Sequence, residues 1–319
     1  MPKAKPRISI VGAGRMGTVL GRALARAGYE IPVVITNHDA TAARSARIIG
    51  AKTLGINAKD LAQASDAKVI RLVMSDILVI STPDDVIPTV AKQLSEIVSK
   101  HPRDSNRPGR SKVALHTSGA LASDILEPLR TVGLGIGSIH PLVSIANQTS
   151  DVAVFRDAFF CLEGDRQAVA RAHALVADLA GKAFEIDSSC KPLYHAAAVL
   201  TAGHVVSLFD IALEMLKACG VTSRKAQAVL LPLLRSTVAN LESSSTAESL
   251  TGSFARADVE TIKKHLAAIK AISSEEALTA YISLGRHSLS LAKQLPLPAK
   301  RLNEIDNVLR RSRDKLTRS

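Results

Sequence analysis

The segment Ile8–Gly17 constrains the fold of this chain more than any other stretch. An apolar run rich in β-branched residues leads directly into a glycine-rich turn, and a helical pattern follows. The turn reads Gly12, Ala13, Gly14, Arg15, Met16, Gly17. A G-x-G-x-x-G turn between a strand and a helix predicts a dinucleotide site. The first glycine permits the tight turn, the second lets the backbone approach a pyrophosphate, and the third allows close helix packing. The alternative is the same strand–turn–helix unit without a ligand.

Composition limits the class of protein. With 319 residues, the chain is long enough for two domains with their own cores. Hydrophobic residues make up 46%, which excludes a disordered chain, and we expect no apolar run of the roughly 18–20 residues that span a membrane. The first residues are too few and too polar for a signal peptide. The cysteines lack metal-ligand spacing, so we expect no metal site and a cytoplasmic protein with reduced thiols at Cys161, Cys190 and Cys219.

The charge balance favours anionic partners. The chain holds 41 Lys and Arg against 29 Asp and Glu, a net charge of +12. Much of the positive charge lies in the segment Lys100–Lys112 and in the C-terminal run from Arg310. Nucleic-acid binding also needs stacking side chains, and the chain has no Trp and three Tyr. A solvated basic surface is therefore the better interpretation than a nucleic-acid interface.

Strand and helix patterns alternate in the first part of the chain. This alternation predicts an α/β fold, a Rossmann-type doubly wound and mostly parallel sheet, over residues 1–187. The apolar segment Val69–Met74 leaves one strand boundary open. After Ile8–Val11, the predicted strands are Ile31–Ile35, Ile77–Ser81, Val113–His116, Gly135–His140, Phe159–Leu162 and Ala183–Ile186, with a helix at Gln167–Ala180.

Residues 188–319 show helical patterns and no convincing strand. We therefore expect an all-α C-terminal domain that contributes to the substrate site. Its long apolar helices would leave apolar surface exposed in a single copy, which favours a homodimer through this domain. The predicted helices are Pro192–Cys219, Ser223–Glu242, Ala257–Ile272, Ser274–Gln294 and Ala299–Lys315.

The end of the second strand bears on cofactor choice. A carboxylate at this place binds the ribose of NAD, whereas neutral hydrogen-bonding residues with a nearby cation suit the 2′-phosphate of NADP. Here the strand ends in Thr36, Asn37 and His38, and Arg44 follows on the next helix. This pattern favours NADP, with NAD left open because Asp39 could reach the ribose. A second turn, Ser81-Thr82-Pro83, follows the strand beside the glycine turn and should also line the cofactor site.

Two histidines end neighbouring strands of the predicted sheet. His116 and His140 both lie where the carboxyl edge of the sheet meets the nicotinamide end of a dinucleotide, and Ser118 adds a hydroxyl. An imidazole there can donate to a carbonyl or imine, or relay its proton. The alternative is a structural histidine that caps a turn.

Lys191 and His195 share one face at the start of the long helix, four residues apart. That helix begins where the chain leaves the sheet domain, so we expect both side chains to border a cleft between the domains. Either one could supply a proton to a reduced product. We expect the neighbouring Tyr194 to point elsewhere. The alternative is a solvated helix start.

The motifs together resemble a known group. They read G-A-G-R-M-G, S-T-P-D-D, H-T-S-G-A, G-S-I-H-P-L, K-P-L-Y-H-A-A-A-V and L-T-G-S-F-A-R-A-D. The chain resembles bacterial Rossmann-like proteins with a helical C-terminal domain of unknown function, which are described as NADP oxidoreductases. More distantly it is similar to pyrroline-carboxylate reductases, deazaflavin-dependent NADP reductases and β-hydroxyacid dehydrogenases. The last group uses a catalytic Lys with an Asn one turn later, whereas here Lys191 is followed by His195.

These observations predict an NADP-dependent oxidoreductase. It would transfer a hydride between nicotinamide and the C=O or C=N carbon of a small acidic metabolite. His116 or His140 would orient the acceptor, and Lys191 or His195 would supply the proton. The alternative from another class is a non-catalytic NADP-binding sensor or scaffold protein. Binding to nucleic acid or to a membrane is not expected.

Overall fold

The computed structural model describes residues 5–50, 52–60, 71–72, 75–101, 112–272 and 274–316. It divides into two compact units, Met1–Leu200 and Thr201–Ser319. The sequence predicts the change of structure at residues 187 and 188. The observed division comes after Leu200, later than the predicted boundary. The reason is that the first turns of the long helix pack with the sheet unit and bring Lys191 and Tyr194 against its strands.

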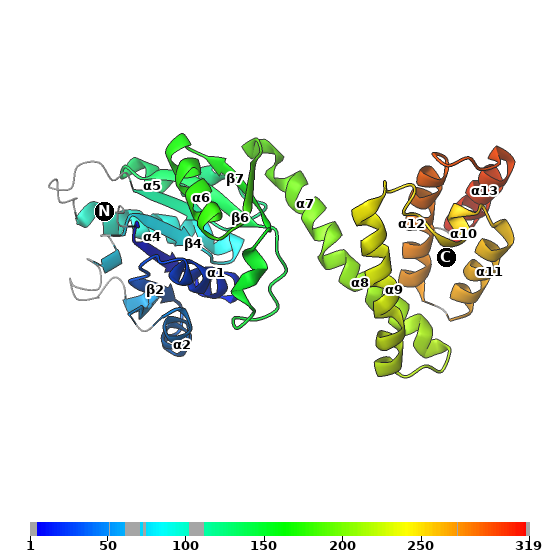
Figure 1. Cartoon of the computed structure of the whole chain (residues 1–319), viewed down its shortest axis with the longest axis horizontal. Coiled ribbons are helices and arrows are strands. Elements are labelled where there is room, and N and C mark those ends of the chain that lie inside the picture. The colour runs from blue at the N-terminus through cyan, green and yellow to red at the C-terminus, as the bar shows by residue number, and fades with distance from the viewer. Residues whose placement is uncertain are drawn as a thin grey trace. The chain divides into compact units, whose positions relative to one another are not determined.

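The first unit is built on one eight-stranded sheet (Figure 1). The strand order is β3-β2-β1-β4-β5-β6-β7-β8, and the only antiparallel pair among these strands is β6 with β7. The predicted Rossmann-type sheet is confirmed, with the reservation that β7 reverses direction. The strands are β1 (Ile8–Val11), β2 (Val33–Thr36), β3 (Leu54–Asn57), β4 (Ile77–Ile80), β5 (Val113–His116), β6 (Gly135–Pro141), β7 (Phe159–Gly164) and β8 (Lys182–Glu185).

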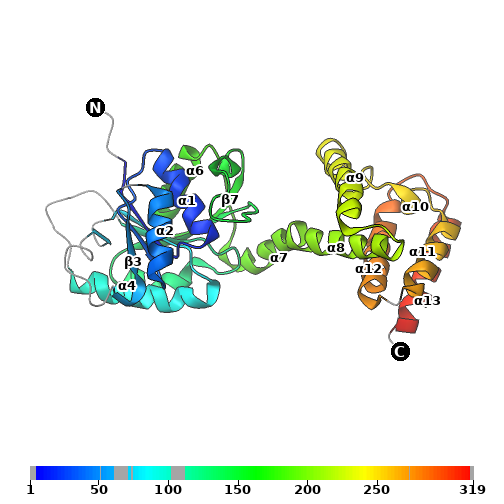
Figure 2. The ribbon, with the colours of Figure 1, turned by 90° about the horizontal axis from the view of Figure 1, so that it is seen from below.

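Helices cover both faces of this sheet, as a doubly wound fold requires. Figure 2 shows α1 (Arg15–Arg26), α2 (Asp39–Ile49) and α6 (Arg166–Asp178) on one face and α4 (Ile87–Lys100) on the other. The second face also carries η3 (Ser123–Leu126) and α5 (Glu127–Thr131). The remaining short helices of this unit are η1 (Ala58–Asp60), η2 (Asp84–Val86), η4 (Val152–Phe155) and η5 (Ser188–Cys190).

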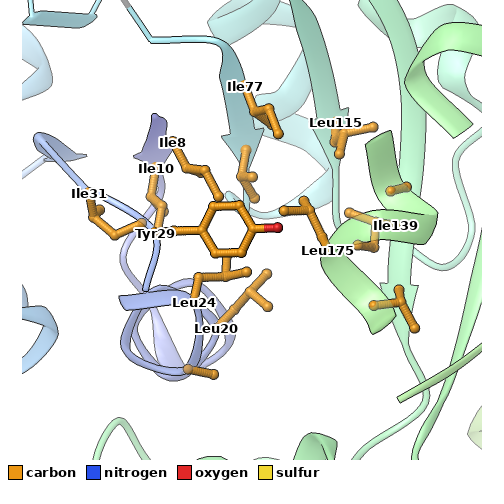
Figure 3. Close-up of a cluster of buried hydrophobic side chains, with 14 of the residues drawn as sticks. Ile8, Ile10, Leu20, Leu24, Tyr29, Ile31, Ile77, Leu115, Ile139 and Leu175 are labelled. Carbon is orange, nitrogen blue, oxygen red and sulfur yellow. The ribbon is translucent and has the colours of Figure 1, made fainter. Parts of the chain in front are cut away.

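Each face of the sheet has its own apolar core. Figure 3 shows the first core, where Tyr29 packs between residues of β1 and α1 and faces Leu175 of α6. Central strands such as β1 and β4 are buried along their whole length, which explains why they consist of Ile, Leu and Val except at Ser9. The strands thereby fix where their carboxyl ends, and the loops that follow, come together.

Some predictions differ from the structure or fall outside it. The edge strand β3 was not predicted, because Ile56 is its one fully buried residue and its neighbours are polar or small. Most of Val69–Met74 and most of the basic segment Lys100–Lys112 lie outside the described residues.

The second unit is helical throughout its described residues, as predicted. Its core forms from residues of α11, α12 and α13, including Ile262, Ile282 and Ile305. The long helix begins in the sheet unit as α7 (Lys191–Thr201). The helices that follow are α8 (Gly203–Ala218), α9 (Ser223–Ser243), α10 (Gly252–Ala255), α11 (Val259–Ala271), α12 (Glu275–Ala292) and α13 (Ala299–Leu316).

One expectation about the apolar segments is wrong. The helix Ser188–Ala218, 31 residues long, meets the length and composition of a membrane span. The polar residues His195, His204 and Ser207 interrupt the apolar run, but the apolar residues outweigh them and few charged residues lie within it. A single helix of this kind is weak evidence for a span, because helices of soluble proteins meet the same test.

Candidate active site beside the glycine turn

The glycine turn has the geometry that its sequence predicts. Gly12 adopts φ +93°, and a Cβ there would lie 2.6 Å from the backbone of Ser81 and Thr82. A Cβ on Gly17 would overlap the carbonyl oxygen of Gly12, so this glycine lets α1 approach the turn. Nothing lies within 4 Å of a Cβ on Gly14. The turn is therefore tightly packed at Gly12 and Gly17 and open at its middle glycine, Gly14.

A cavity of about 710 Å³ opens in front of this turn. Of the predicted cofactor residues, Arg15, Met16, Gly17 and Arg44 do not line it. Arg44 is an exposed residue of α2, and Met16 packs against the core. The predicted residues that do line the cavity are Gly12, Ala13, Gly14, Thr36, Asn37, His38, Ser81, Thr82 and Pro83.

The cavity also contains residues that sequence reasoning missed. Lys59 of η1 lines it together with the end of β2, because β2 and β3 are parallel neighbours and Thr36 pairs with Asn57. Gln148 lines it too and donates a hydrogen bond of 2.9 Å to the carbonyl of Ala13. Among the described lining residues there is no Asp or Glu, and Asp39 is not one of them. The described lining residues thus present one side-chain ammonium and no carboxylate.

A hydroxyl contact joins this cavity to the loop after β5, and a second contact holds that loop to η2. The hydroxyl of Thr117 donates to that of Ser81 across 3.0 Å. The hydroxyl of Ser118 donates to Asp84 at 2.9 Å and accepts from the backbone N–H groups of Ala120 and Leu121. Because these contacts use its one hydrogen and both lone pairs, the Ser118 side chain fixes the loop.

His116 is fully buried at the end of β5. Its Nδ1 accepts from the backbone N–H of Ser118 at 3.2 Å, and its Nε2 lies 3.3 Å from the carbonyl of Ala122. A carbonyl only accepts, so the proton lies on Nε2. Burial, reinforced by the positive charge of Lys191, lowers the pKa of His116 to about 3. His116 is therefore an uncharged side chain with both nitrogens bound to the backbone of the loop.

Lys191 is buried at the first turn of α7 rather than solvated. Its ammonium donates to the carbonyl of Ser118 and to the hydroxyl of Ser138, both at 2.9 Å. Burial lowers its pKa, while the negative charges of Glu163 and Asp84 oppose that shift. Lys191 thus ties α7 to the loop after β5 and to β6. Because 0% of its surface is exposed, its ammonium contacts protein groups and not solvent.

His140 and Tyr194 form a pair that sequence reasoning missed. The hydroxyl of Tyr194 lies 2.6 Å from Nδ1 of His140, and a hydrogen bond also links Tyr194 to the thiol of Cys161. Burial lowers the pKa of His140 to about 4, helped by the charge of Lys191, and burial raises the pKa values of Tyr194 and Cys161. The signal available in the sequence was the spacing of Tyr194, one turn after Lys191.

His195 completes this group. Its ring meets that of His140 edge to face, with centroids 5.5 Å apart. Its Nδ1 is buried without a hydrogen-bond partner against Gly119, and a Cβ on Gly119 would overlap it. The predicted catalytic residues His116, Ser118, His140, Lys191 and His195 therefore come together around one loop of the sheet unit.

Comparison with known families confirms the resemblance predicted from the motifs. Residues 1–141 match a Rossmann-like domain, and residues 158–288 match a domain of unknown function, DUF2520. The second match begins at the reversed strand β7, so it includes the last part of the sheet as well as helices. The two matches follow each other in this order along the chain. A comparison with curated proteins found no match.

Solved structures share the fold at low sequence identity. A Bacteroides fragilis protein provisionally designated an NADP oxidoreductase is 20% identical, with a TM-score of 0.65 over 92% of this chain and 98% of that one. An imine reductase from Myxococcus stipitatus in complex with NADP⁺ is 20% identical, with a TM-score of 0.58 over 89% and 94%. The 1-pyrroline-5-carboxylate reductase of Streptococcus pyogenes is 16% identical, with a TM-score of 0.56 over 98% and 100%.

Proposed function

We propose that this protein is an NADP-dependent oxidoreductase that transfers a hydride between nicotinamide and a C=O or C=N carbon of a small acidic metabolite. The observation that carries the proposal is the cavity in front of Gly14, which adjoins a cluster of buried histidine, lysine and tyrosine side chains. The imine reductase and the pyrroline-carboxylate reductase that share the fold support the same class of reaction.

The turn fits the pyrophosphate of a dinucleotide. The open face of Gly14 lets a phosphate approach the backbone, and the N-terminus of α1 points its free N–H groups there. Gly12 and Gly17 keep the turn close to β4 and α1, so no side chain fills that space. When bound, the cofactor would supply the hydride, and the protein would supply position and hydrogen bonds.

The cavity residues favour NADP over NAD. Lys59 offers an ammonium at the end of β2, where the 2′-position of the ribose lies in this fold. A carboxylate there would bind the 2′-hydroxyl of NAD and repel a phosphate, and the described lining residues include none. Thr36, Asn37 and His38 offer further polar groups. Lys59 therefore takes the role that the sequence assigns to Arg44.

The residues around Gly119 divide into two roles. His116, Ser118 and Lys191 hold the loop and the start of α7, because their polar atoms are already bound to protein groups. His140 and His195 lie against Gly119 and are the residues that we place next to the substrate. The Lys–Asn pair of the β-hydroxyacid dehydrogenases has no equivalent function in this arrangement, because Lys191 is buried.

Thermal unfolding with and without nucleotide tests the proposal. NADPH at a saturating concentration should raise the melting temperature more than NADH does, since binding to the folded state stabilises it. Absence of a shift with both nucleotides would contradict cofactor binding. A shift with NADPH but no NADPH oxidation with keto acids and cyclic imines would favour the second candidate, a non-catalytic NADP-binding protein. The burial of Lys191 is the observation that favours that candidate.

We further propose a homodimer in the cytoplasm, formed through the helical unit. Helix α9 spans 21 residues, yet Ala226 is its one buried side chain. Large apolar residues of the unit are exposed, among them Val206, Val229, Leu233 and Leu241. Such a surface suits a second copy of the chain better than water. The unpaired thiols Cys161, Cys190 and Cys219 fit a reducing compartment.

A further inference from the structure

We infer that the substrate is a carbonyl compound whose oxygen accepts a hydrogen bond from Nε2–H of an uncharged His140, in the space that Gly119 leaves open. This inference rests on the proposed oxidoreductase function and selects C=O over protonated C=N. It makes His140 a catalytic residue and Tyr194 a positioning residue. Four observations carry it.

The first is the direction of the hydrogen bond between Tyr194 and His140. The hydroxyl oxygen and Nδ1 are 2.6 Å apart, and the hydroxyl also meets the thiol of Cys161. A thiol sulfur is a weak acceptor, whereas an imidazole nitrogen is a strong one. The Tyr194 O–H therefore donates to Nδ1. This leaves the imidazole proton of His140 on Nε2.

The second is that His140 stays uncharged at neutral pH. It is largely buried and lies beside the ammonium of Lys191. Both effects disfavour an imidazolium, and they lower the pKa of His140 to about 4. The titratable side chains around it are Lys191, Tyr194 and His195 of α7, Cys161 and Glu163 of β7, and His116 of β5.

The third is the absence of a side chain at position 119. A Cβ on Gly119 would lie 2.8 Å from Nε2 of His140, so a methyl group there would cover this nitrogen. Nε2 has no hydrogen-bond partner among the described residues, and Nδ1 of His195 is unpartnered against the same glycine. Gly119 therefore leaves unsatisfied polar groups facing one small space.

The fourth is the kind of substrate atom that the Nε2–H group of His140 can bind. An Nε2–H group donates, so the substrate atom that it meets must carry a lone pair. A carbonyl oxygen has two lone pairs, whereas the nitrogen of a protonated imine has none. An uncharged Nε2–H group thus selects a carbonyl oxygen over the nitrogen of a protonated imine. An uncharged imidazole that polarises a carbonyl is a known catalytic arrangement. The hydride of NADPH adds to the carbonyl carbon, the π electrons of the C=O bond move to the oxygen that Nε2–H holds, and this alkoxide takes its proton from solvent.

The experiment follows NADPH oxidation between pH 6 and 8 with glyoxylate, pyruvate and the cyclic imine 2-methyl-1-pyrroline. The wild type should reduce a carbonyl probe with a kcat that does not fall through an imidazole titration. His140→Leu should lower kcat about a hundredfold, as loss of one such donor does, and His140→Gln should recover part of it because its amide donates. Gly119→Ala should abolish turnover, because its methyl group would cover Nε2 of His140.

A substrate-free measurement keeps the inference testable if a variant folds poorly. ¹⁵N shifts of labelled imidazoles in the wild-type protein should report His140 as the uncharged Nε2–H form from pH 5.5 to 8, and Tyr194→Phe should mix the two tautomers. An Nδ1–H form, titration near pH 6.5, or turnover of the imine alone would overturn the inference. NADPH binding without reduction of any probe would also overturn it and leave cofactor binding intact. Absence of NADPH binding by the wild type would instead remove the proposed function.

Discussion

The ammonium of Lys191 donates a hydrogen bond of 2.9 Å to the hydroxyl of Ser138, and neither side chain is exposed to solvent. This contact, with the equal one to the carbonyl of Ser118, fixes the start of α7 against β6 and the loop after β5. The positions of Tyr194 and His195 follow from it, because both lie within the next turn of the same helix.

Replacing Lys191 should therefore reduce stability as well as activity. Lys191→Met keeps the volume but leaves two buried acceptors without a donor, which costs about 1–3 kcal/mol for each unsatisfied group. Urea unfolding at pH 7 measures the change. Lys182→Met is the matched control, because Lys182 is exposed and its distance to Asp157 is 3.6 Å. That variant should lose about 0–1 kcal/mol, and equal losses in both variants would contradict the role of Lys191.

Replacing Lys59 should weaken NADPH binding selectively. Loss of a charged partner of the 2′-phosphate costs about 1.5–3 kcal/mol, or roughly a factor of 10 to 150 in Kd. Lys59→Ala should show this loss in fluorescence titration with NADPH and leave the Kd for NADH nearly unchanged. Arg44→Ala is the control and should bind both nucleotides as the wild type does. The reverse result would restore Arg44 as the phosphate ligand.

The middle and last glycines of the turn should separate folding from binding. Gly14→Ala should fold normally, since nothing lies within 4 Å of the new Cβ, but its methyl group would occupy the space of the pyrophosphate. Gly17→Ala should lower the melting temperature, because its Cβ would overlap the Gly12 carbonyl. Melting curves with and without NADPH measure both effects. A Gly14→Ala protein that NADPH stabilises fully would contradict the placement of the phosphates.

Acid should destabilise the sheet unit through its buried histidines. Unfolding returns His116 and His140 to an ordinary pKa near 6.5, whereas burial holds them at about 3 and about 4 in the folded protein. The unfolded state therefore binds more protons below about pH 6.5, and the free energy of unfolding falls as the pH drops. The slope should approach about 1.4 kcal/mol per pH unit for each histidine and weaken below the folded pKa values.

Urea unfolding at pH 7, 6, 5 and 4.5 measures this slope. His140→Gln should remove roughly half of it, because one of the two titrating groups is lost. An unchanged slope in that variant would show that His140 is protonated in the folded protein.

A charged residue on α9 should separate the dimer. Leu233 is 63% exposed in a single chain, and Leu233→Asp would place a charge in an apolar interface. Light scattering after gel filtration should report a monomer for this variant and a dimer for the wild type. Leu142→Asp, at an exposed leucine of the sheet unit, is the control and should remain dimeric. A monomeric wild type would contradict the proposed assembly.

The parts that sequence predicts well depend on local patterns. The glycine turn, the strand ends at His116 and His140, and the helical second unit follow from contiguous residues. Tyr194 was expected to point away, because it precedes His195 by about 100° on the helix. In the structure His140 lies between them and contacts both rings. Helical phase alone does not reveal which side chain a neighbouring strand will meet.

The site residues that the sequence does not reveal are positioned by segments that lie far away along the chain. Lys59 reaches the cofactor cavity only because β3 pairs with β2, and β3 itself gave a weak signal. The sequence predicts that Lys191 borders a cleft and leaves a solvated helix start as the alternative, whereas its burial requires acceptors from two other segments. Arg44 follows the right strand but projects from an exposed position of α2. Proximity in the chain points to Arg44, whereas the cation that lines the cavity is Lys59.

A crystal structure of the protein with NADP⁺ tests the account most directly. We expect the pyrophosphate on the turn at Gly14, the 2′-phosphate within hydrogen-bond distance of the Lys59 ammonium, and the nicotinamide ring beside His140 and Gly119. A turn left empty at saturating NADP⁺, or a nucleotide bound elsewhere on the chain, would contradict the account.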